Sequence, residues 1–232
     1  MRVRIAAVLL ALSVGIAVEA SAAPFGPTPY LQASDSPFTG LSFSYFFLEN
    51  FEDHNLNTPG ATGLTGGPTS IVFGPGVHDS VDADDGAIDG SGLNGDSWFN
   101  SGASTGFSFD ATALGGLLPT HVGLVWTDGP FLTAVSFVAF GSDGVTVVCA
   151  IGGSGFANTS FNGETAEDRF FGCSDPGGIS RVTMTNTLGG GIEVDHLQYG
   201  RAGVAVPEPG TLALVGLGSL LLGVRQRRRR RA

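Results

Sequence analysis

The acidic side chains between residues 79 and 96 are the first candidates for chemistry in this sequence. A calcium ion takes about six to eight oxygen ligands at once, so aspartates gathered in one stretch suggest a calcium site. The spacing does not fit an EF-hand loop, because aligning Gly86 with the invariant glycine of that loop puts Val81 and Ala83 at ligand positions. A solvated acidic loop is the competing interpretation. The aspartates concerned are Asp79, Asp82, Asp84, Asp85, Asp89 and Asp96.

Two other patterns could in principle perform hydrolysis. Glu164, Glu167 and Asp168 could supply the acid and the base of a glycosidase, but their closeness in sequence favours a solvated turn. The stretch 102–106 matches the G-x-S-x-G pattern of serine hydrolases, with Ser104 as the nucleophile. That mechanism needs a sharp strand-to-helix turn, and nothing after Ser104 has a helical pattern. Hydrolysis is therefore the weakest of the functional hypotheses.

The four histidines give no metal motif of their own. His54, His78, His121 and His196 are not spaced as His-x-His or His-x-x-x-His, so a zinc site could arise only through the fold. Surface histidines are the default interpretation.

The strand expected at 192–199 carries an irregularity. Its apolar residues occupy positions 192 and 194 and then 197 and 199, so the alternation slips by one residue. A β-bulge inserts one extra residue into a strand and has this effect. The sequence therefore predicts a bulge at Asp195-His196, and bulges often re-aim side chains near sites.

The elements that must position these residues are strands. The 232 residues include 37 glycines, 12 prolines and 17 phenylalanines, with 42% hydrophobic and only 14% charged residues. Apolar residues alternate in many short segments bounded by turn signals, which is typical of strands. We therefore expect one all-β domain, a two-layer sandwich most similar to a jelly roll. The expected strands include 41–50, 121–127, 134–140, 145–151, 168–173 and 179–187.

Two cysteines occur in the chain, Cys149 and Cys173. Each lies near the end of an expected strand, so a disulfide between two strands is geometrically reasonable. Such a bond fits a protein that folds outside the cytoplasm. Two separate buried thiols are the alternative.

The net charge of −10 conceals a strong asymmetry along the chain. All 11 basic residues are arginines, and eight of them lie at the two ends, leaving three between Ala23 and Val206. That span holds 19 acidic residues, for a net charge near −16. A domain of this charge repels phosphate backbones and anionic lipid, which argues against binding to nucleic acid.

The N-terminal segment predicts export. A basic head at Arg2 and Arg4 precedes an apolar run from Ile5 to Val18 and an Ala-x-Ala site at 20–22. These three parts make a secretory signal peptide, residues 1–22, with cleavage expected after Ala22. The all-β domain then spans residues 23–202, and residues 203–232 form a C-terminal segment.

The C-terminal segment also has three parts. Pro207-Glu208-Pro209 makes a rigid spacer, an apolar run follows from Thr211 to Val224, and arginines close the chain from 225 to 231. As a helix the apolar run spans only about 21 Å, which is short for a hydrocarbon core of ~30 Å. The arginines are expected to stay on the cytoplasmic side, with the acidic domain outside. An ordinary tail anchor is one interpretation.

This tail resembles the PEP-CTERM sorting signal of exported bacterial proteins, which is also catalogued as an ice-binding-protein C-terminal anchor. The resemblance covers the last 27 residues or so and includes the namesake Pro207, Glu208 and Pro209. It implies that an exosortase-type membrane enzyme recognises the tail, cuts near the motif and transfers the protein to the cell surface. The family is typical of bacteria that make exopolysaccharide.

The central domain resembles, more weakly, the jelly rolls of carbohydrate-binding modules. The resemblance rests on the stretches 51–53 and 191–195, which look like the paired first and last strands of such modules. In many of these modules acidic residues of the two strands hold a structural calcium, and the resemblance places Glu52, Asp53 and Asp195 as the ligands here. Trp98 and Trp126 are the only tryptophans, and the core-like pattern around Trp126 puts a sugar-stacking platform in doubt.

These features support three functional hypotheses. The first is a non-enzymatic surface or matrix protein, held transiently in the membrane by its tail and associated with exopolysaccharide. The second is a carbohydrate-binding module stabilised by calcium. The third is an envelope hydrolase. No other cofactor is indicated.

Overall fold

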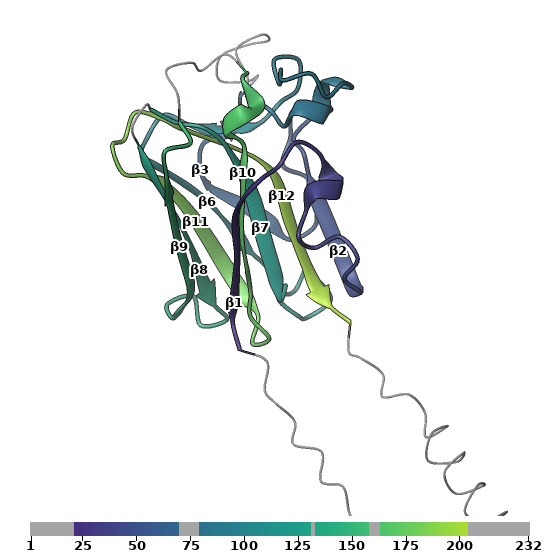
Figure 1. Ribbon diagram of the computed structural model, residues 1–232. Coiled ribbons are helices and arrows are strands. Elements are labelled where there is room, and N and C mark those ends of the chain that lie inside the picture. Colours follow the sequence, from purple (N-terminus) through teal and green to yellow (C-terminus); the bar gives the residue numbers. More distant parts are fainter. Residues whose placement is uncertain (1–20, 70–78, 131–132, 158–162, 204–232) are drawn as a thin grey trace, which may run out of the picture.

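The fold is an all-β sandwich, as the sequence predicted (Figure 1). The computed structural model describes residues 21–69, 79–130, 133–157 and 163–203. The predicted signal helix and C-terminal helix lie outside the described residues, as do Pro207, Glu208, Pro209 and His78. Within those four ranges, no helix combines the length and the apolar character that a membrane span requires.

The strands form two antiparallel sheets that pack face to face. The larger sheet has the order β1-β10-β7-β12-β5-β4, and β2 also pairs with β12. Its members are β1 (Ala23–Pro29), β2 (Phe43–Glu49), β4 (Gly67–Pro68), β5 (Trp98–Asn100), β7 (His121–Asp128), β10 (Arg169–Ser174) and β12 (Ile192–Ala202).

The smaller sheet has the order β3-β6-β11-β8-β9. Its members are β3 (Ala61–Thr65), β6 (Ser104–Phe109), β8 (Ala134–Gly141), β9 (Val147–Ser154) and β11 (Ile179–Asn186). Short 3₁₀ helices interrupt the loops at η1 (Ala33–Asp35), η2 (Asp82–Asp85) and η3 (Thr165–Glu167). The six strands expected at 41–50, 121–127, 134–140, 145–151, 168–173 and 179–187 correspond to β2, β7, β8, β9, β10 and β11.

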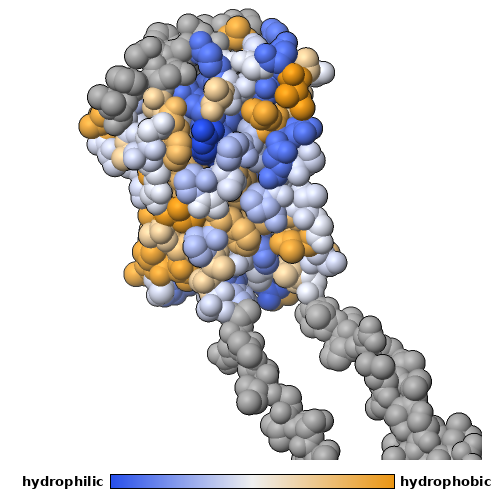
Figure 2. Space-filling view, viewed as in Figure 1, coloured by the Kyte–Doolittle hydropathy of each residue, from blue (hydrophilic) through white to orange (hydrophobic). Residues whose placement is uncertain are grey.

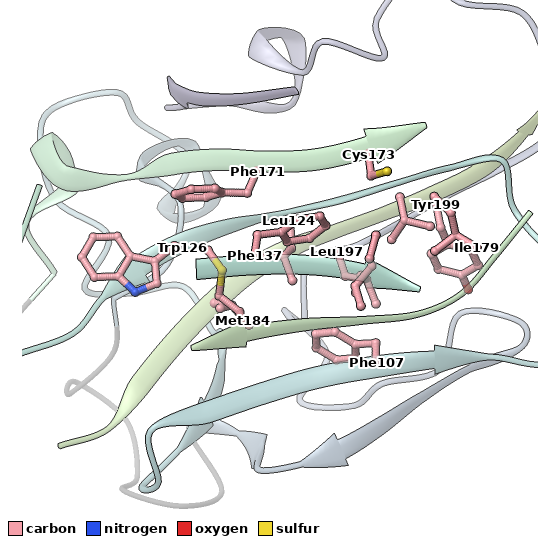
Figure 3. Packing of buried hydrophobic residues seen from close by; sticks show 14 of the residues in the cluster. Phe107, Leu124, Trp126, Phe137, Phe171, Cys173, Ile179, Met184, Leu197 and Tyr199 are labelled. Atoms are coloured by element: carbon pink, nitrogen blue, oxygen red, sulfur yellow. The ribbon is translucent and has the colours of Figure 1, made fainter. Parts of the chain in front are cut away.

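The main core fills the space between the two sheets (Figure 3). Leu124 and Trp126 of β7 and Leu197 and Tyr199 of β12 contribute alternate side chains from the larger sheet. Facing them from the smaller sheet are Phe107, Phe137, Ile179 and Met184. Alternation along each strand sends one face of each sheet into this core, because successive side chains point to opposite sides.

A second, smaller core covers the outer face of the larger sheet. Tyr30, Phe38 and Val81 come from the loops that carry η1 and η2, and they pack on Val125 and Phe170. Strand β7 is therefore buried on both faces, which explains its nearly continuous burial in place of the expected half-buried pattern.

The predicted bulge at Asp195-His196 is confirmed. Asp195 pairs with Val125 and Gln198 pairs with Gly123, so two residues of β12 face a single residue of β7. His196 takes a left-handed φ of 43°, which is uncommon for a residue with a side chain. Before the bulge β12 pairs with β5, and after it β12 pairs with β2.

The two ends of the sandwich differ in what they carry. Strand β1 begins at Ala23 and β12 ends at Ala202 at one end of the sandwich (Figure 1). The 3₁₀ helices η2 and η3 lie at the opposite end, where β1 ends and β12 begins. The segments that leave the domain therefore depart from the end opposite to η2 and η3.

The predicted disulfide is also confirmed. Cys149 of β9 and Cys173 of β10 are bonded, with their Cα atoms 6.1 Å apart. Because β9 belongs to the smaller sheet and β10 to the larger, the bond fastens the two layers to each other.

Replacing both cysteines with serine should lower the free energy of unfolding by about 3 kcal/mol, since the bond restricts a loop of 24 residues in the unfolded chain. Denaturant unfolding of the oxidised protein and of the double variant measures the difference. Dithiothreitol should weaken the original protein by a similar amount and leave the variant unchanged. A difference below about 0.5 kcal/mol would show that the bond is dispensable.

His121, at the start of β7, lies among aromatic rings. Its ring centroid is 5.4 Å from those of Phe38 and Phe43, and both rings meet it edge-on. Burial lowers the pKa of this histidine below its ordinary value of 6.5. The folded state therefore favours the neutral ring, and the stability that this provides is present above pH 6.5 and is lost as the pH falls through the lowered pKa.

We accordingly expect protonation of His121 to oppose folding between pH 7.5 and pH 5. Acidification should therefore disfavour the folded original protein relative to His121→Gln, which cannot take up a proton. Thermal unfolding at the two pH values, compared between the two proteins, measures the effect. An equal change of unfolding temperature in both proteins would show that His121 does not contribute to the pH dependence.

Candidate functional site

Buried carboxylates gather at the end of the sandwich that carries η2 and η3. Figure 2 shows strongly hydrophilic residues toward this end, among smaller apolar areas. The acidic residues there that are almost inaccessible to solvent are Asp79, Asp82, Asp96, Glu167, Asp168, Glu193 and Asp195. The interpretation of residues 79–96 as a solvated loop therefore fails for Asp79, Asp82 and Asp96, and that of residues 164–168 as a solvated turn fails for Glu167 and Asp168.

The sheet register explains how distant residues meet here. Asp128 ends β7 and lies directly opposite Glu193, near the start of β12. Glu167 ends η3, and Asp168 follows it immediately before β10 begins. Because β7, β10 and β12 are neighbours in one sheet, their ends at this edge bring these carboxylates together with the loop that carries η2.

One group of ligand-type side chains consists of Asp84, Asp195 and His196, whose ligand atoms lie within 4.8 Å of one another. His196 Nε2 is 2.8 Å from Asp84 Oδ2, and its Nδ1 is 2.8 Å from the Tyr30 hydroxyl. Asp195 Oδ2 accepts a hydrogen bond from the Val81 amide at 2.9 Å, and Oδ1 accepts one from the His196 amide. Each of these polar atoms has a hydrogen-bond partner within the protein, and the bonds connect η2 and its loop to β12.

The network extends along β12 under η1. Gln198 Nε2 donates to the Tyr30 hydroxyl at 2.9 Å, and the Ser36 hydroxyl donates to Gln198 Oε1. Burial is the main cause that raises the pKa of Tyr30, so this phenol stays neutral. The bulge turns His196 toward these partners, which sequence periodicity indicated only as an irregularity.

The residues that the resemblance placed as calcium ligands are only partly brought together. Glu52 is half-buried, and its Oε1 accepts a hydrogen bond from the Asp96 amide at 2.6 Å. Asp53 is exposed and accepts hydrogen bonds from Asn55 and from Asn57, within its own turn. Burial is the main cause that raises the pKa of Asp195, and the charges of Asp84 and Glu52 add to it. Calcium binding by Glu52, Asp53 and Asp195 stays a prediction.

A second group lies nearer the start of β12, where Glu193 pairs with Asp128. Oxygens of Asp79, Asp128 and Glu167 all fall within 4.8 Å of one another. Asp79 is 1% exposed, and neither of its carboxylate oxygens has a hydrogen-bond partner among the described residues. Asp168 is fully buried, and both of its oxygens likewise lack a partner within this described part of the chain.

Glu193 lies beside this second group, and its carboxylate has several hydrogen-bond donors. Its Oε1 accepts hydrogen bonds from the hydroxyls of Ser97 and Thr69 and from the Asp79 amide. Burial is the main cause that raises its pKa to about 7, and it raises the pKa of Asp128 to about 7 as well. Burial also raises the pKa of Asp79 well above its usual range, and the negative charge of Glu193 is the second cause of this rise.

Asp128 of the second group and the adjacent Glu193 were not among the candidate residues of the sequence. Asp128 stands directly before Gly129, where a turn is expected. Glu193 occupies a polar position in the strand 192–199, where alternation predicts solvent exposure. The one available signal was the nearly complete lack of basic residues in the domain, since it leaves no partner for a carboxylate that becomes buried.

The other residues that the sequence suggested as candidates contribute to the sheets and the core of the domain. Ser104 begins β6, and its hydroxyl donates to the Met184 carbonyl across the sheet, so the strand-to-helix turn of a serine hydrolase is not formed there. Trp98 and Trp126 are buried in the main core, as the pattern around Trp126 predicted. A groove of about 400 Å³ lies beside η1 and is lined by Phe38, Phe43, Phe46 and other residues.

The C-terminal residues match a known sorting motif. Residues 205–230 fit the family model described as the PEP-CTERM protein-sorting motif. The resemblance stated for the tail is thereby confirmed, and the motif indicates an exported protein that an exosortase-type enzyme sorts to the envelope. The matched residues lie outside the described part of the structure.

No curated protein matches the sequence. Among solved structures, the chain is similar to the enzymatically active domain of tailspike protein 4 from bacteriophage CBA120, at 16% identity and a TM-score of 0.28. The similarity covers 75% of this chain but only 22% of that structure, so this chain spans less than a quarter of its length. No functional conclusion follows from so distant a likeness.

The Asp84–His196–Tyr30 network generates a stability prediction. Replacing His196 with alanine should lower the free energy of unfolding by about 2–4 kcal/mol, because it leaves Asp84 without its buried partner and removes one of the two buried hydrogen bonds of the Tyr30 hydroxyl. Urea denaturation measures the loss. The matched control is His54→Ala, since His54 also pairs with an aspartate, the buried Asp96, but has a side chain that is 60% exposed, so that water can take its place. That variant should lose less than about 1 kcal/mol, and equal losses in the two variants would contradict the prediction.

Proposed function

We propose that this protein is a non-enzymatic component of the cell surface or extracellular matrix and that it associates with exopolysaccharide. The observation that carries the proposal is the position of the sorting motif. The motif begins at residue 205, three residues after β12 ends at Ala202, so the tail leaves the end of the sandwich opposite to the acidic loops. A domain held through this tail would direct its acidic end outward.

The tail itself supports a transient attachment to the membrane. Its apolar run, 211–224, would enter the bilayer, and the terminal arginines would remain on the cytoplasmic side. An exosortase-type enzyme acting near Pro207-Glu208-Pro209 would then release the domain from this anchor to the surface. The Cys149–Cys173 disulfide supports folding in an oxidising compartment, where such a bond persists.

The outward end supports an interaction with carbohydrate. Its loops expose polar side chains such as Asp89 and Asn94, and carboxylates and amides hydrogen-bond to sugar hydroxyls. The net charge near −16 of residues 23–206 opposes direct contact with an anionic polymer. The proposed partner is accordingly a neutral exopolysaccharide.

A second candidate function is a carbohydrate-binding module that calcium stabilises. The buried carboxylates of Asp79 and Asp168, which lack hydrogen-bond partners, favour it because a cation would offset their charge. This candidate requires that binding to polysaccharide be lost when calcium is chelated. The first candidate does not require calcium for a neutral polymer.

The test compares the full chain with a variant that ends at Gly203, both produced in the host and followed in cell-surface, medium and exopolysaccharide fractions. The full chain should be found at the surface and with the exopolysaccharide. The variant should be lost from the surface into the medium, yet it should still sediment with purified exopolysaccharide. Surface retention of the shortened variant would contradict the sorting role of the tail.

The same sedimentation, repeated with calcium and with a chelator, separates the two candidates. Binding in both conditions supports the surface-component function, and binding that needs calcium supports the carbohydrate-binding module. No sedimentation of either protein in either condition would overturn the association with exopolysaccharide.

A further inference from the structure

We propose that Asp79, Asp128 and Glu167 bind one calcium ion at the acidic end of the sandwich. These residues differ from Glu52, Asp53 and Asp195, the set that the resemblance to carbohydrate-binding modules indicates. The proposal also stands apart from polysaccharide association, since the site would bind its ion whether or not a glycan is present.

The first argument is geometric. One carboxylate oxygen from each of the three residues lies within 4.8 Å of the other two. Calcium–oxygen distances are about 2.3–2.6 Å, so two ligands on opposite sides of one ion stand about 4.6–5.2 Å apart. The three oxygens can therefore contact a common ion without a large rearrangement. They come from the end of β7, the end of η3 and the loop before η2.

The second argument is the state of Asp79. This side chain is 1% exposed, and both of its oxygens are buried without a hydrogen-bond donor in the part of the chain that the structure describes. Its amide donates to Glu193, a further carboxylate, so the backbone adds no positive partner to the group. A buried charge without compensation is costly, and a cation is the partner that a group of carboxylates can share.

Asp168 is a second buried carboxylate whose oxygens have no hydrogen-bond donor among the described residues. Arg169 follows it in the chain, but the Nη1 of that arginine donates to the backbone carbonyls of Ala166 and Asp168. These hydrogen bonds of the arginine thus go to backbone oxygens and not to the Asp168 carboxylate.

The contrast with the other acidic group supports the choice of site. In the group of Asp84, Asp195 and His196, the carboxylate oxygens accept hydrogen bonds from His196 and Val81. An ion there would have to displace those bonds. No such bonds would be lost at Asp79, whose oxygens are unpartnered.

The donor set selects the ion. Asp79, Asp128 and Glu167 offer only carboxylate oxygens, which suit hard cations and not zinc or copper. Magnesium demands near-ideal octahedral geometry and keeps several waters, whereas calcium accepts an irregular set of about six to eight oxygens. Carboxylates held by three different segments fit the tolerant geometry of calcium.

The test uses the purified full chain, freed of metal with a chelator, and measures calcium binding by isothermal titration calorimetry. We expect one calcium per chain and a higher unfolding temperature when calcium is added. Asp79→Asn should weaken calcium affinity at least about ten-fold, because it removes one charged ligand. In chelator this variant should unfold at the same temperature as the original protein or higher, because it lacks an uncompensated buried charge.

The matched control is Asp89→Asn, which removes the same charge from an exposed residue at the same end of the domain. It should bind calcium within about two-fold of the original protein, since it leaves the ligand set intact. Glu167→Gln provides a second site variant if Asp79→Asn fails to fold, and it should show the same loss of affinity.

Three results would overturn the proposal. The first is no calcium binding up to about 5 mM, above the range of ~10⁻⁴–10⁻³ M typical of extracellular calcium modules. The second is binding that survives in Asp79→Asn and Glu167→Gln but is lost in Asp195→Asn, which would assign the ion to Asp195. The third is equal affinity for magnesium and calcium, which would contradict the identity of the ion.

Discussion

The pairing of β12 with three different strands is the constraint on which the rest of this domain depends. One strand contacts β7 along its length, β5 near its start and β2 near its end. In a regular strand the side chains alternate between the two faces of the sheet along the whole length. The bulge at Asp195-His196 shifts this alternation by one residue midway along β12. Val194 and Leu197 both enter the main core as a result, while His196 turns toward the loops that carry η1 and η2. The second core and the acidic end are therefore both organised around this one extra residue.

Electrostatics then divides the acidic end into two parts. Where a donor is available, a buried carboxylate stabilises a loop by accepting hydrogen bonds. Asp195 accepts one from the Val81 amide, and Asp82 accepts them from the amides of Asp89 and Gly90. Where no donor is available, as at Asp79 and Asp168, burial and like charges raise the pKa. The domain has only three arginines and no lysine to relieve this repulsion. The remaining ways to do so are proton uptake or a bound cation.

Sequence patterns predicted the strands well because alternation is a local property. The segments at 121–127 and 134–140 and the slip at Asp195-His196 could be identified from neighbouring residues alone. The acidic end could not, because Asp128 and Glu193 meet across two strands whose pairing depends on the whole sheet order. Burial of Glu167 and Asp168 could not be predicted either, since a short acidic segment is solvated in most proteins.

The acidic loops and the last residue of β12 lie at opposite ends of the sandwich. Two strands, β10 and β7, lie between β1 and β12, and every pairing along this path is antiparallel. Strands β1 and β12 therefore run in opposite directions, which places the first residue of β1 and the last residue of β12 at one end. Because the sorting motif follows β12 directly, the acidic loops occupy the far end of the sandwich. Repulsion among carboxylates is then confined to the part of the domain most distant from the tail. A cation that binds there would order the loops without disturbing the strands that lead to the sorting motif.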